Sequence, residues 1–473
     1  MELFWFEILK FTLLQSVLSA VFSVLLGAIL ARFLWCNQGL RLEGFLTAMG
    51  ALTFVMPVMI PALGFMLFFD GAGGEKLYGL AGIVLVHVFL NAAYCMVQIR
   101  GAYERFITPS LQQQCDLLGF SKKERLRYLE FPALRSTLIN SFLVVFCLSL
   151  SSFSIVLLLG GGPSSTTLSV ALYHALSVSF DLKNAGFFLG LQLMLSLVFA
   201  SLLYHQKQHQ KEVKIQREPQ SFQGKFRELK ELFLGCVLGI YIMPLIPILR
   251  VLVLPKEGIQ TALNSLVLTG ILGIISSVFV VGCTLSFLAY FLKTSRPMTS
   301  LLSTLVYLFL SVPKIVLVGG IFLLCHSFLE GKTIVYSLII FVTLLAYLPF
   351  CLKSFLPDFK VFQNRYGRQI NLLNFSLFEI FQTIIWPYLH QKIRRKLAMI
   401  TCFSMGNLSI PLLLGQMEVE TLPVLTYQAF LRYDTEKAAF YMACLVLLMG
   451  SIYGVSYVFN KERRRVYEHH IAP

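Results

Sequence analysis

The sequence is poor in charge and in residues that could do chemistry. Only 13% of its 473 residues are Asp, Glu, Lys or Arg, about half the usual share in soluble domains. Its ten cysteines include no CxxC pair, and no Cys/His cluster has metal-ligand spacing. No constellation of catalytic residues is evident. These absences exclude a disulfide framework and a zinc site, and they give no support to an enzyme.

The sequence is instead rich in apolar residues. They make up 57% of the chain, and the mean hydropathy is +0.74. They occur in runs of about 20 residues or more, the length that crosses a bilayer as a helix. The sequence therefore predicts an all-α polytopic membrane protein of about eleven spans. The predicted spans cover 11–34, 45–69, 77–97, 137–159, 185–204, 233–254, 264–292, 300–325, 334–352, 397–415 and 438–459.

The net charge of +15 is unevenly distributed along the chain. With an outer N-terminus, the inner loops and the tail carry 30 of the 39 Lys and Arg residues. The outer loops FDGAGGEK and GQMEVETLP carry compensating acids. Because basic loops stay on the cytoplasmic side, the N-terminus is predicted outside and the C-terminus inside. The basic charge is thus explained by the membrane, and no nucleic-acid partner is expected.

The chain is also an internal repeat. DLLGFSKKERLRYLEFP (116–132) recurs 255 residues later as NLLNFSLFEIFQTIIWP (371–387), and in both copies a proline follows thirteen positions after Gly or Asn. FSIVLLLG recurs as LSIPLLLG at the same offset. Both copies lie on the same side of the membrane, so the repeat is parallel. Parallel repeats commonly enclose a transport path.

The first copy of the repeated cytoplasmic segment has helix-end signals. Gly119 tolerates the backbone geometry of a helix end, and Ser121 with Glu124 has capping-box spacing. Leu126 and Leu129 then lie near one face of a short helix that Pro132 ends or kinks. One interpretation is an amphipathic helix in the lipid headgroups. The other is a helix that docks in a protein groove, favoured by the apolar second copy.

This pattern resembles the cytoplasmic coupling segment of ABC importer permeases. That segment typically has Glu-Ala-Ala, three residues and Gly; here Gln113, Gln114 and Cys115 replace Glu-Ala-Ala. The resemblance implies two coupling segments, about 105–135 and 360–392. Their candidate ATPase-coupling residues are Gly119, Phe120, Ser121, Leu126 and Pro132 in the first, and Asn374, Phe375, Ser376, Phe381 and Pro387 in the second.

The resemblance covers nearly the whole chain and implies two fused type I permease halves. The first half is 1–205 with five spans, 206–232 is a cytoplasmic linker, and the second half is 233–473 with six spans. It implies a bacterial inner-membrane protein with two copies of a separate ATPase, a periplasmic binding protein and surrounding lipids as partners. ATP is then used by the ATPase, and this chain binds no cofactor or metal.

The stretch LLLGGGPSSTTLSVALYHALSVSFD (157–181) looks like the permeases of thiamine importers, which implies thiamine or its phosphates as cargo. Ferric-iron permeases share the fused layout and are the nearest alternative. A secondary transporter with fused halves is a third, but no predicted span has Asp or Glu near its middle to couple protons.

Residues 164–180 and 421–434 are expected to form outer gate helices that meet the binding protein. Tyr173 and Tyr427 occupy matching positions and could face each other across the path, where aromatic rings suit a cation; interfacial anchoring is the plainer alternative. Lys314 is an intramembrane charge that could act as a gate or pair with an acid. The remaining candidates for the path or outer gate are Ser154 and Ser409.

Overall fold

The computed structural model is helical throughout the part of the chain that it describes. That part comprises residues 2–37, 40, 42–46, 53, 56–69, 77–208, 227–250, 259–293, 312–326, 331–372, 376–416 and 418–470. Seven of its helices are long and apolar enough to cross a membrane. They coincide with seven of the predicted spans, so the multi-pass helical class is confirmed and the count of about eleven stays a prediction.

The chain forms two compact units, and each is described by itself. The first comprises 1–171 and 194–247, and the second 172–193 and 248–473. The unit boundaries therefore fall within the helices α9 (Leu168–Ser177), α10 (Leu182–Gln208) and α12 (Leu245–Arg250). The division by sequence repeat into 1–205, 206–232 and 233–473 remains a prediction, and most of the linker lies outside the described residues.

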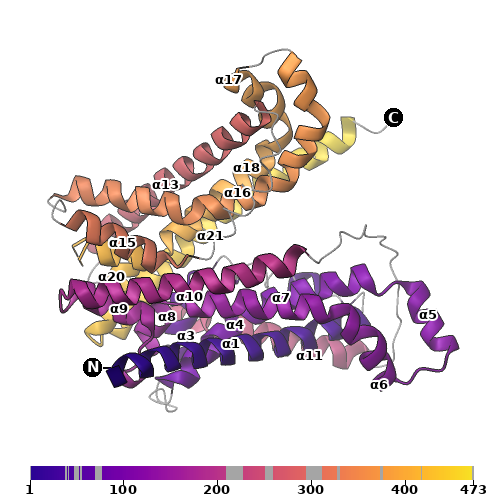
Figure 1. Ribbon diagram of the computed structural model, residues 1–473, viewed down its shortest axis with the longest axis horizontal. Coiled ribbons are helices and arrows are strands. Elements are labelled where there is room, and N and C mark those ends of the chain that lie inside the picture. The colour runs from indigo at the N-terminus through magenta and orange to yellow at the C-terminus, as the bar shows by residue number, and fades with distance from the viewer. Residues whose placement is uncertain are drawn as a thin grey trace. The chain divides into compact units, whose positions relative to one another are not determined.

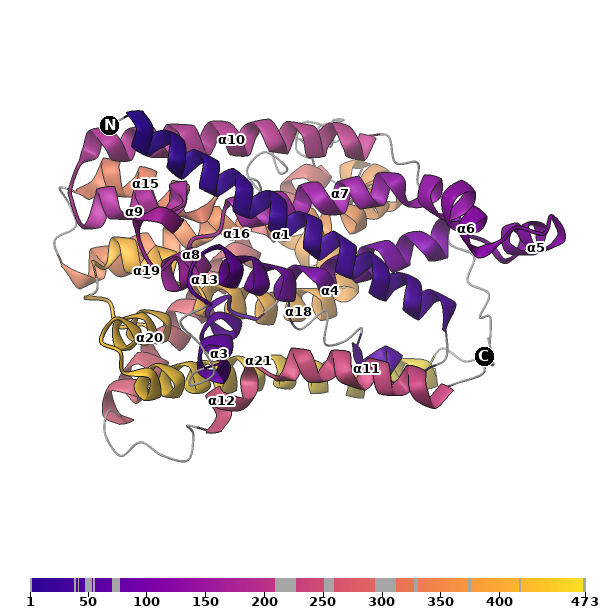
Figure 2. The same ribbon diagram turned by 90° about the horizontal axis from the view of Figure 1, so that it is seen from below.

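The first unit is built on three mutually packed helices, α1 (Glu2–Cys36), α4 (Leu80–Phe106) and α7 (Phe131–Leu150). Figure 1 shows them side by side, with the N-terminus at one end and α5 and α6 at the other, and Figure 2 shows the same arrangement from below. A Cβ on Gly27 would come within 2.4 Å of the Cys95 Cβ, so the glycine allows α1 and α4 to approach closely. The unit's remaining elements are α3 (Met59–Phe69), α5 (Pro109–Leu117), α6 (Lys122–Arg125), η2 (Leu126–Glu130), α8 (Ser154–Leu159), η3 (Pro163–Ser165) and α11 (Arg227–Ile242).

The second unit repeats this plan. Its α13 (Ile259–Lys293), α16 (Lys332–Leu372) and α18 (Trp386–Met405) pack together, and α21 (Thr435–His470) lies against α18 (Figure 1). Their interior includes a cluster of apolar side chains near the end of the bundle where α17 lies. The unit's remaining elements are α15 (Lys314–Cys325), α17 (Leu377–Ile380), η6 (Phe381–Ile385), α19 (Ser409–Leu414) and α20 (Leu422–Leu431).

Several predicted spans are not continuous helices, and two of the breaks lie at matching positions of the repeats. The span 137–159 is broken between α7 and α8, and 397–415 between α18 and α19. At the first break the Ser151 hydroxyl donates to the Cys147 carbonyl, 2.6 Å away, at the end of α7. At the second, the Asn407 side chain accepts the Ile410 N–H and starts α19. Short polar side chains thus add hydrogen bonds to the backbone at these points.

Candidate functional site

Within the first coupling segment, α5 ends in a backbone conformation that favours glycine. Gly119 has φ +69°, its N–H donates to the Asp116 carbonyl, and the Phe120 N–H donates to the Cys115 carbonyl. These two bonds form a Schellman motif, in which the left-handed residue closes the last turn of α5. The backbone at Gly119 therefore has the geometry of a helix end, which is the role predicted for this residue from the sequence. Asn374 and Phe375, the matching positions, lie outside the described residues.

In both coupling segments, the next helix (α6 or α17) starts with the same capping box. The Ser121 hydroxyl accepts the Glu124 N–H, and the Glu124 carboxylate accepts the Ser121 N–H at 2.8 Å. Ser376 and Glu379 make the same pair of bonds, with 2.7 Å between the Ser376 nitrogen and the carboxylate. Each box satisfies two backbone N–H groups at a helix start. The first box was predicted from the sequence and the second was not, although the Ser-x-x-Glu spacing is present in both.

A π-helical turn joins each coupling helix to the longer helix that follows, α7 or α18. The Phe131 N–H donates to the Leu126 carbonyl, five residues back, and the Trp386 N–H donates to the Phe381 carbonyl. Pro132 and Pro387 come next; a proline has no N–H and crowds the carbonyl four residues before it, so a wider turn accommodates it. The short helix expected to stop at Pro132 is therefore continuous with α7, and the kink takes the form of a π turn.

Large apolar side chains are exposed on both coupling segments. Leu117 and Leu118 are 88% and 71% exposed, and Leu126, named from the sequence, is 44% exposed. In the second segment Phe378 is 71% exposed, whereas Phe381 is half-buried. An exposed apolar patch of this kind is typical of a surface that a partner protein covers. Leu117 and Leu118 were not named as site residues, although the hydrophobic pair belongs to the repeated motif.

An ion-pair network holds the first π turn against its neighbours. The Glu130 side chain is 1% exposed and accepts two hydrogen bonds from Arg32, from Nε at 2.8 Å and from Nη2 at 3.2 Å. The Tyr103 hydroxyl donates to Glu130 Oε2 at 2.9 Å. We call these three residues the polar elbow. Sequence reasoning missed it because its members come from three helices up to 98 residues apart.

The second unit places apolar residues at the matching positions. Ala289, Phe359 and Ile385 follow Arg32, Tyr103 and Glu130 by 257, 256 and 255 residues, in the register of the repeat. All three are at most 3% exposed and belong to the apolar cluster of that unit. We call them the apolar elbow. The same turn is thus fixed by charge and hydrogen bonds in one repeat and by packing in the other.

The gate helices α9 and α20 carry the two candidate tyrosines. Tyr173 and Tyr427 belong to the second unit, are each 5% exposed, and interact electrostatically. Matching residues that were expected to face each other thus lie near one another. Their burial differs from the exposure typical of membrane-interface anchors.

Each gate helix ends in the same return turn. Phe180 and Tyr433 adopt positive φ angles of 48° and 57° and are 60% and 90% exposed. The next residues, Asp181 and Asp434, accept backbone N–H groups three residues on and cap α10 and α21. Partial burial raises the pKa of Asp434, but hydrogen bonds and the charge of Lys437 outweigh it and leave the pKa below its ordinary value. The capping carboxylate is therefore ionised at neutral pH.

Lys314 has a tyrosine as its partner. Its Nζ donates to the Tyr347 hydroxyl at 2.8 Å and lies 4.5 Å from the centre of that ring. The Tyr347 hydroxyl in turn donates to the Phe403 carbonyl. Among the described residues, the structure shows no acid paired with Lys314. The ammonium is exposed and is stabilised by a hydrogen bond and a cation–π contact.

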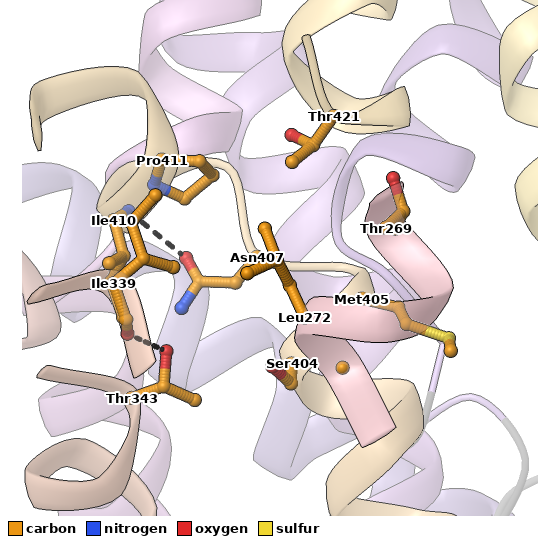
Figure 3. Close-up of a pocket in the computed structure, with 11 residues that line it drawn as sticks. Thr269, Leu272, Ile339, Thr343, Ser404, Met405, Asn407, Ile410, Pro411 and Thr421 are labelled. Atoms are coloured by element: carbon orange, nitrogen blue, oxygen red, sulfur yellow. Dashed lines mark hydrogen bonds between the residues drawn. The ribbon is translucent and has the colours of Figure 1, made fainter. Parts of the chain in front are cut away.

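A small pocket lies beside the break between α18 and α19. It has a volume of about 20 Å³, enough for one water molecule. Its polar lining comes from Thr269, Thr343, Ser404, Asn407 and Thr421, and Figure 3 shows the Asn407 amide turned toward Ile410. The hydroxyl of Ser409, one of the predicted path residues, donates to Asn407 Oδ1 at 2.9 Å.

Ser154 is half-buried as the first residue of α8, and it does not line this pocket. Among the described residues there is also no group of His, Cys, Asp or Glu that could hold a metal ion.

Comparisons with known proteins agree with these features. Residues 23–212 match the family described as binding-protein-dependent transport system inner membrane component. The chain is 26% identical over 95% of its length to the thiamine transport system permease protein of Brucella abortus, and over 96% to that of Haemophilus influenzae, and covers 87% and 88% of those proteins. A putative ferric transport system permease protein of Haemophilus influenzae is 30% identical over 27% of the chain and 20% of its own length. No solved structure matches.

The matched region contains the first coupling segment, its polar elbow and the gate helix α9. The resemblance drawn from the repeated cytoplasmic segment is thereby confirmed. Residues 23–212 thus match an inner-membrane component of binding-protein-dependent transport systems, and the similarity to transport permeases along 95% of the chain supports a multi-pass transport subunit rather than an enzyme.

Proposed function

We propose that this permease imports thiamine or a thiamine phosphate delivered by a periplasmic binding protein. The observation that carries the proposal is the extent of similarity: the thiamine permeases match along 95% of the chain, whereas the ferric permease matches 27%. Buried Tyr173 and Tyr427 give the gate region aromatic faces, which suit the cationic thiazolium ring of thiamine. Ferric iron is the second candidate, because its permease has the higher local identity.

The paired coupling segments support a core of one permease and two ATPase subunits. Each segment has a capped helix start and exposed apolar side chains, so each offers a docking helix to one ATPase copy. ATP-driven closure of the ATPase dimer moves both segments. The π turns carry that movement into α7 and α18, which switches the permease between inward-facing and outward-facing states. In this proposal ATP itself is bound by the ATPase.

The outer end of the path is formed by the gate helices. In the first unit the N-terminus and the coupling segment lie at opposite ends, which supports a periplasmic N-terminus and a cytoplasmic coupling segment (Figure 1). Exposed Phe180 and Tyr433, at the ends of the gate helices, then face the periplasm and suit contact with the binding protein. The C-terminus is placed in the cytoplasm.

The test is uptake of labelled thiamine in cells that lack their own transporter and express this permease with its ATPase and binding protein. ATP-dependent accumulation that stops when the binding protein is omitted is the expected result. Assembled subunits that accumulate ferric iron and no thiamine would contradict the cargo assignment.

The tyrosine pair gives a second test of the path. We expect Tyr173→Ala combined with Tyr427→Ala to reduce thiamine uptake by more than the product of the two single effects, because the phenols share one environment. Simple multiplication of two small effects would favour separate anchoring roles.

A further inference from the structure

Each gate helix begins on a hydroxyl group that belongs to another helix. The Leu168 N–H, at the start of α9, donates to Thr12 Oγ1 of α1 at 3.0 Å. The Leu422 N–H, at the start of α20, donates to Thr269 Oγ1 of α13 at 2.9 Å. Each bond lies within one compact unit. The first N–H groups of a helix have no acceptor in the helix itself, so these contacts satisfy groups that need a partner.

The orientation of each hydroxyl is fixed by a second bond. Thr12 donates its own hydrogen to the Ile8 carbonyl, and Thr269 donates to the Ser265 carbonyl, both at 2.6 Å. The proton is therefore directed into the threonine's own helix. The oxygen lone pairs are left to accept the N–H of the gate helix. A β-branched side chain has few rotamers in a helix, which makes this geometry well defined.

The residues that would ordinarily cap the gate helices do not do so. Thr167 and Thr421 precede α9 and α20, but within the described structure their hydroxyls have no hydrogen-bond partner. The acceptor comes from α1 and α13 instead. Thr12, Thr269, Leu168 and Leu422 are all at most 2% exposed, so water has little access to replace a lost bond.

The contact is repeated although its surroundings differ. Thr12 and Thr269 occupy corresponding positions of the two repeats, 257 residues apart. Three residues further along, the first repeat has Gln15, whose Nε2 donates to the Ser149 carbonyl, whereas the second has Leu272 beside the pocket. The neighbouring residues differ between the two repeats, whereas the hydrogen bond from the gate-helix N–H to the threonine hydroxyl is present in both.

We propose that Thr12 and Thr269 are positioning residues for transport. Each tethers the first turn of a gate helix to the first long helix of its own repeat, so that the outer gate follows the movement of that helix. This inference rests on the proposed importer function, in which α9 and α20 form the gate. Neither threonine is assigned contact with the cargo.

The test compares threonine, valine and serine at both positions in the complete transporter with its ATPase and binding protein, reconstituted in vesicles. Thr12→Val with Thr269→Val removes both acceptors and keeps the side-chain shape. We expect the amount of cargo moved per ATP hydrolysed to fall roughly tenfold, as the loss of two buried hydrogen bonds at about threefold each would give. Thr12→Ser with Thr269→Ser should restore most of it. Thr284→Val on α13, whose buried hydroxyl donates to the Val280 carbonyl, is the matched control and should stay within about twofold of the parent, because it bears on no gate helix.

Hydrogen exchange provides a readout that does not depend on transport. In Thr269→Val the Leu422 amide should exchange faster than in the parent, and in Thr284→Val its rate should be unchanged. If the parent transports no cargo, the proposed function fails while exchange still tests the tether. Unchanged exchange at both Leu168 and Leu422, or valine variants that transport with full coupling, would overturn the inference.

Discussion

The two coupling segments share one backbone design and differ in what holds it in place. Both have a capping box, a π turn and then a proline. In the first repeat the polar elbow of Arg32, Tyr103 and Glu130 holds the π turn in place. In the second repeat the matching residues are those of the apolar elbow, Ala289, Phe359 and Ile385. The local sequence thus sets the shape of the turn, while either kind of interior can support it.

The two interiors should respond differently to substitution. A buried ion pair is costly to desolvate, so replacing all of it by apolar groups is often neutral, whereas removing one partner leaves a buried charge unpaired. An apolar cluster loses stability in proportion to the volume removed. Four sets of variants test this contrast and the features that the repeats share.

The largest effect is expected from Arg32→Met. Glu130 is 1% exposed and would keep only the Tyr103 hydroxyl as a hydrogen-bond partner. Because Arg32 is itself 40% exposed, the change should cost about 2 kcal/mol of stability. The measurement is the midpoint of thermal unfolding in detergent, and Arg32→Met with Glu130→Gln should recover part of the loss. An unchanged midpoint in the single variant would show that the polar elbow does not stabilise the turn.

Gly119→Val comes next. The φ of +69° is unfavourable for a side chain with a Cβ and costs about 1–2 kcal/mol, more for a β-branched residue. We expect uptake to fall while ATP hydrolysis continues, because the docking helix is displaced. Gly119→Asn should retain most uptake, since asparagine also adopts this conformation and occupies position 374 of the second repeat. Equal loss in both variants would point to a requirement other than backbone geometry.

Ser121→Ala and Ser376→Ala should have smaller and similar effects. Each removes the side-chain half of a capping box, worth about 1 kcal/mol of helix stability. Coupling between ATP hydrolysis and uptake should decrease by the same modest factor in both variants. A severe loss in one and none in the other would mean that the two ATPase copies depend on their docking helices unequally.

The smallest effect should come from the triple change of Arg32→Ala, Tyr103→Phe and Glu130→Ile. It gives the first repeat the elbow residues of the second, and by analogy with buried ion pairs replaced by apolar groups it should leave stability within about 1 kcal/mol of the parent. Thermal unfolding and uptake are again the measurements. A large destabilisation would show that the polar elbow needs its charges for more than filling space.

Local features of this fold could be predicted and interactions between distant segments could not. The end of α5 at Gly119 and the cap at Ser121 follow from residues within four positions, because both depend on backbone hydrogen bonds. The contact of Arg32 with Glu130 depends on how α1 packs against α7, which no local pattern specifies. The same holds for Leu168 and Thr12, 156 residues apart.

The sequence signal for the helix breaks within the predicted spans is weaker than that for the helix end at Gly119 or the cap at Ser121. Ser151 lies in the run SLSSFS, and Asn407 directly follows Gly406, but hydropathy alone does not show that these residues interrupt a helix. Hydropathy measures transfer to lipid and averages over such positions.

The π turns give a reason for the constant interval between Gly119 and Pro132 and between Asn374 and Pro387. An α-helix rotates by about 100° per residue, so the number of residues in the turn sets the rotation of the short helix before it relative to the longer helix after it. A one-residue deletion there would convert π to α geometry and rotate the exposed face of the coupling helix by about 100° about its axis. The thirteen-residue interval, which both repeats share, therefore fixes the direction in which the exposed side chains of each coupling helix point.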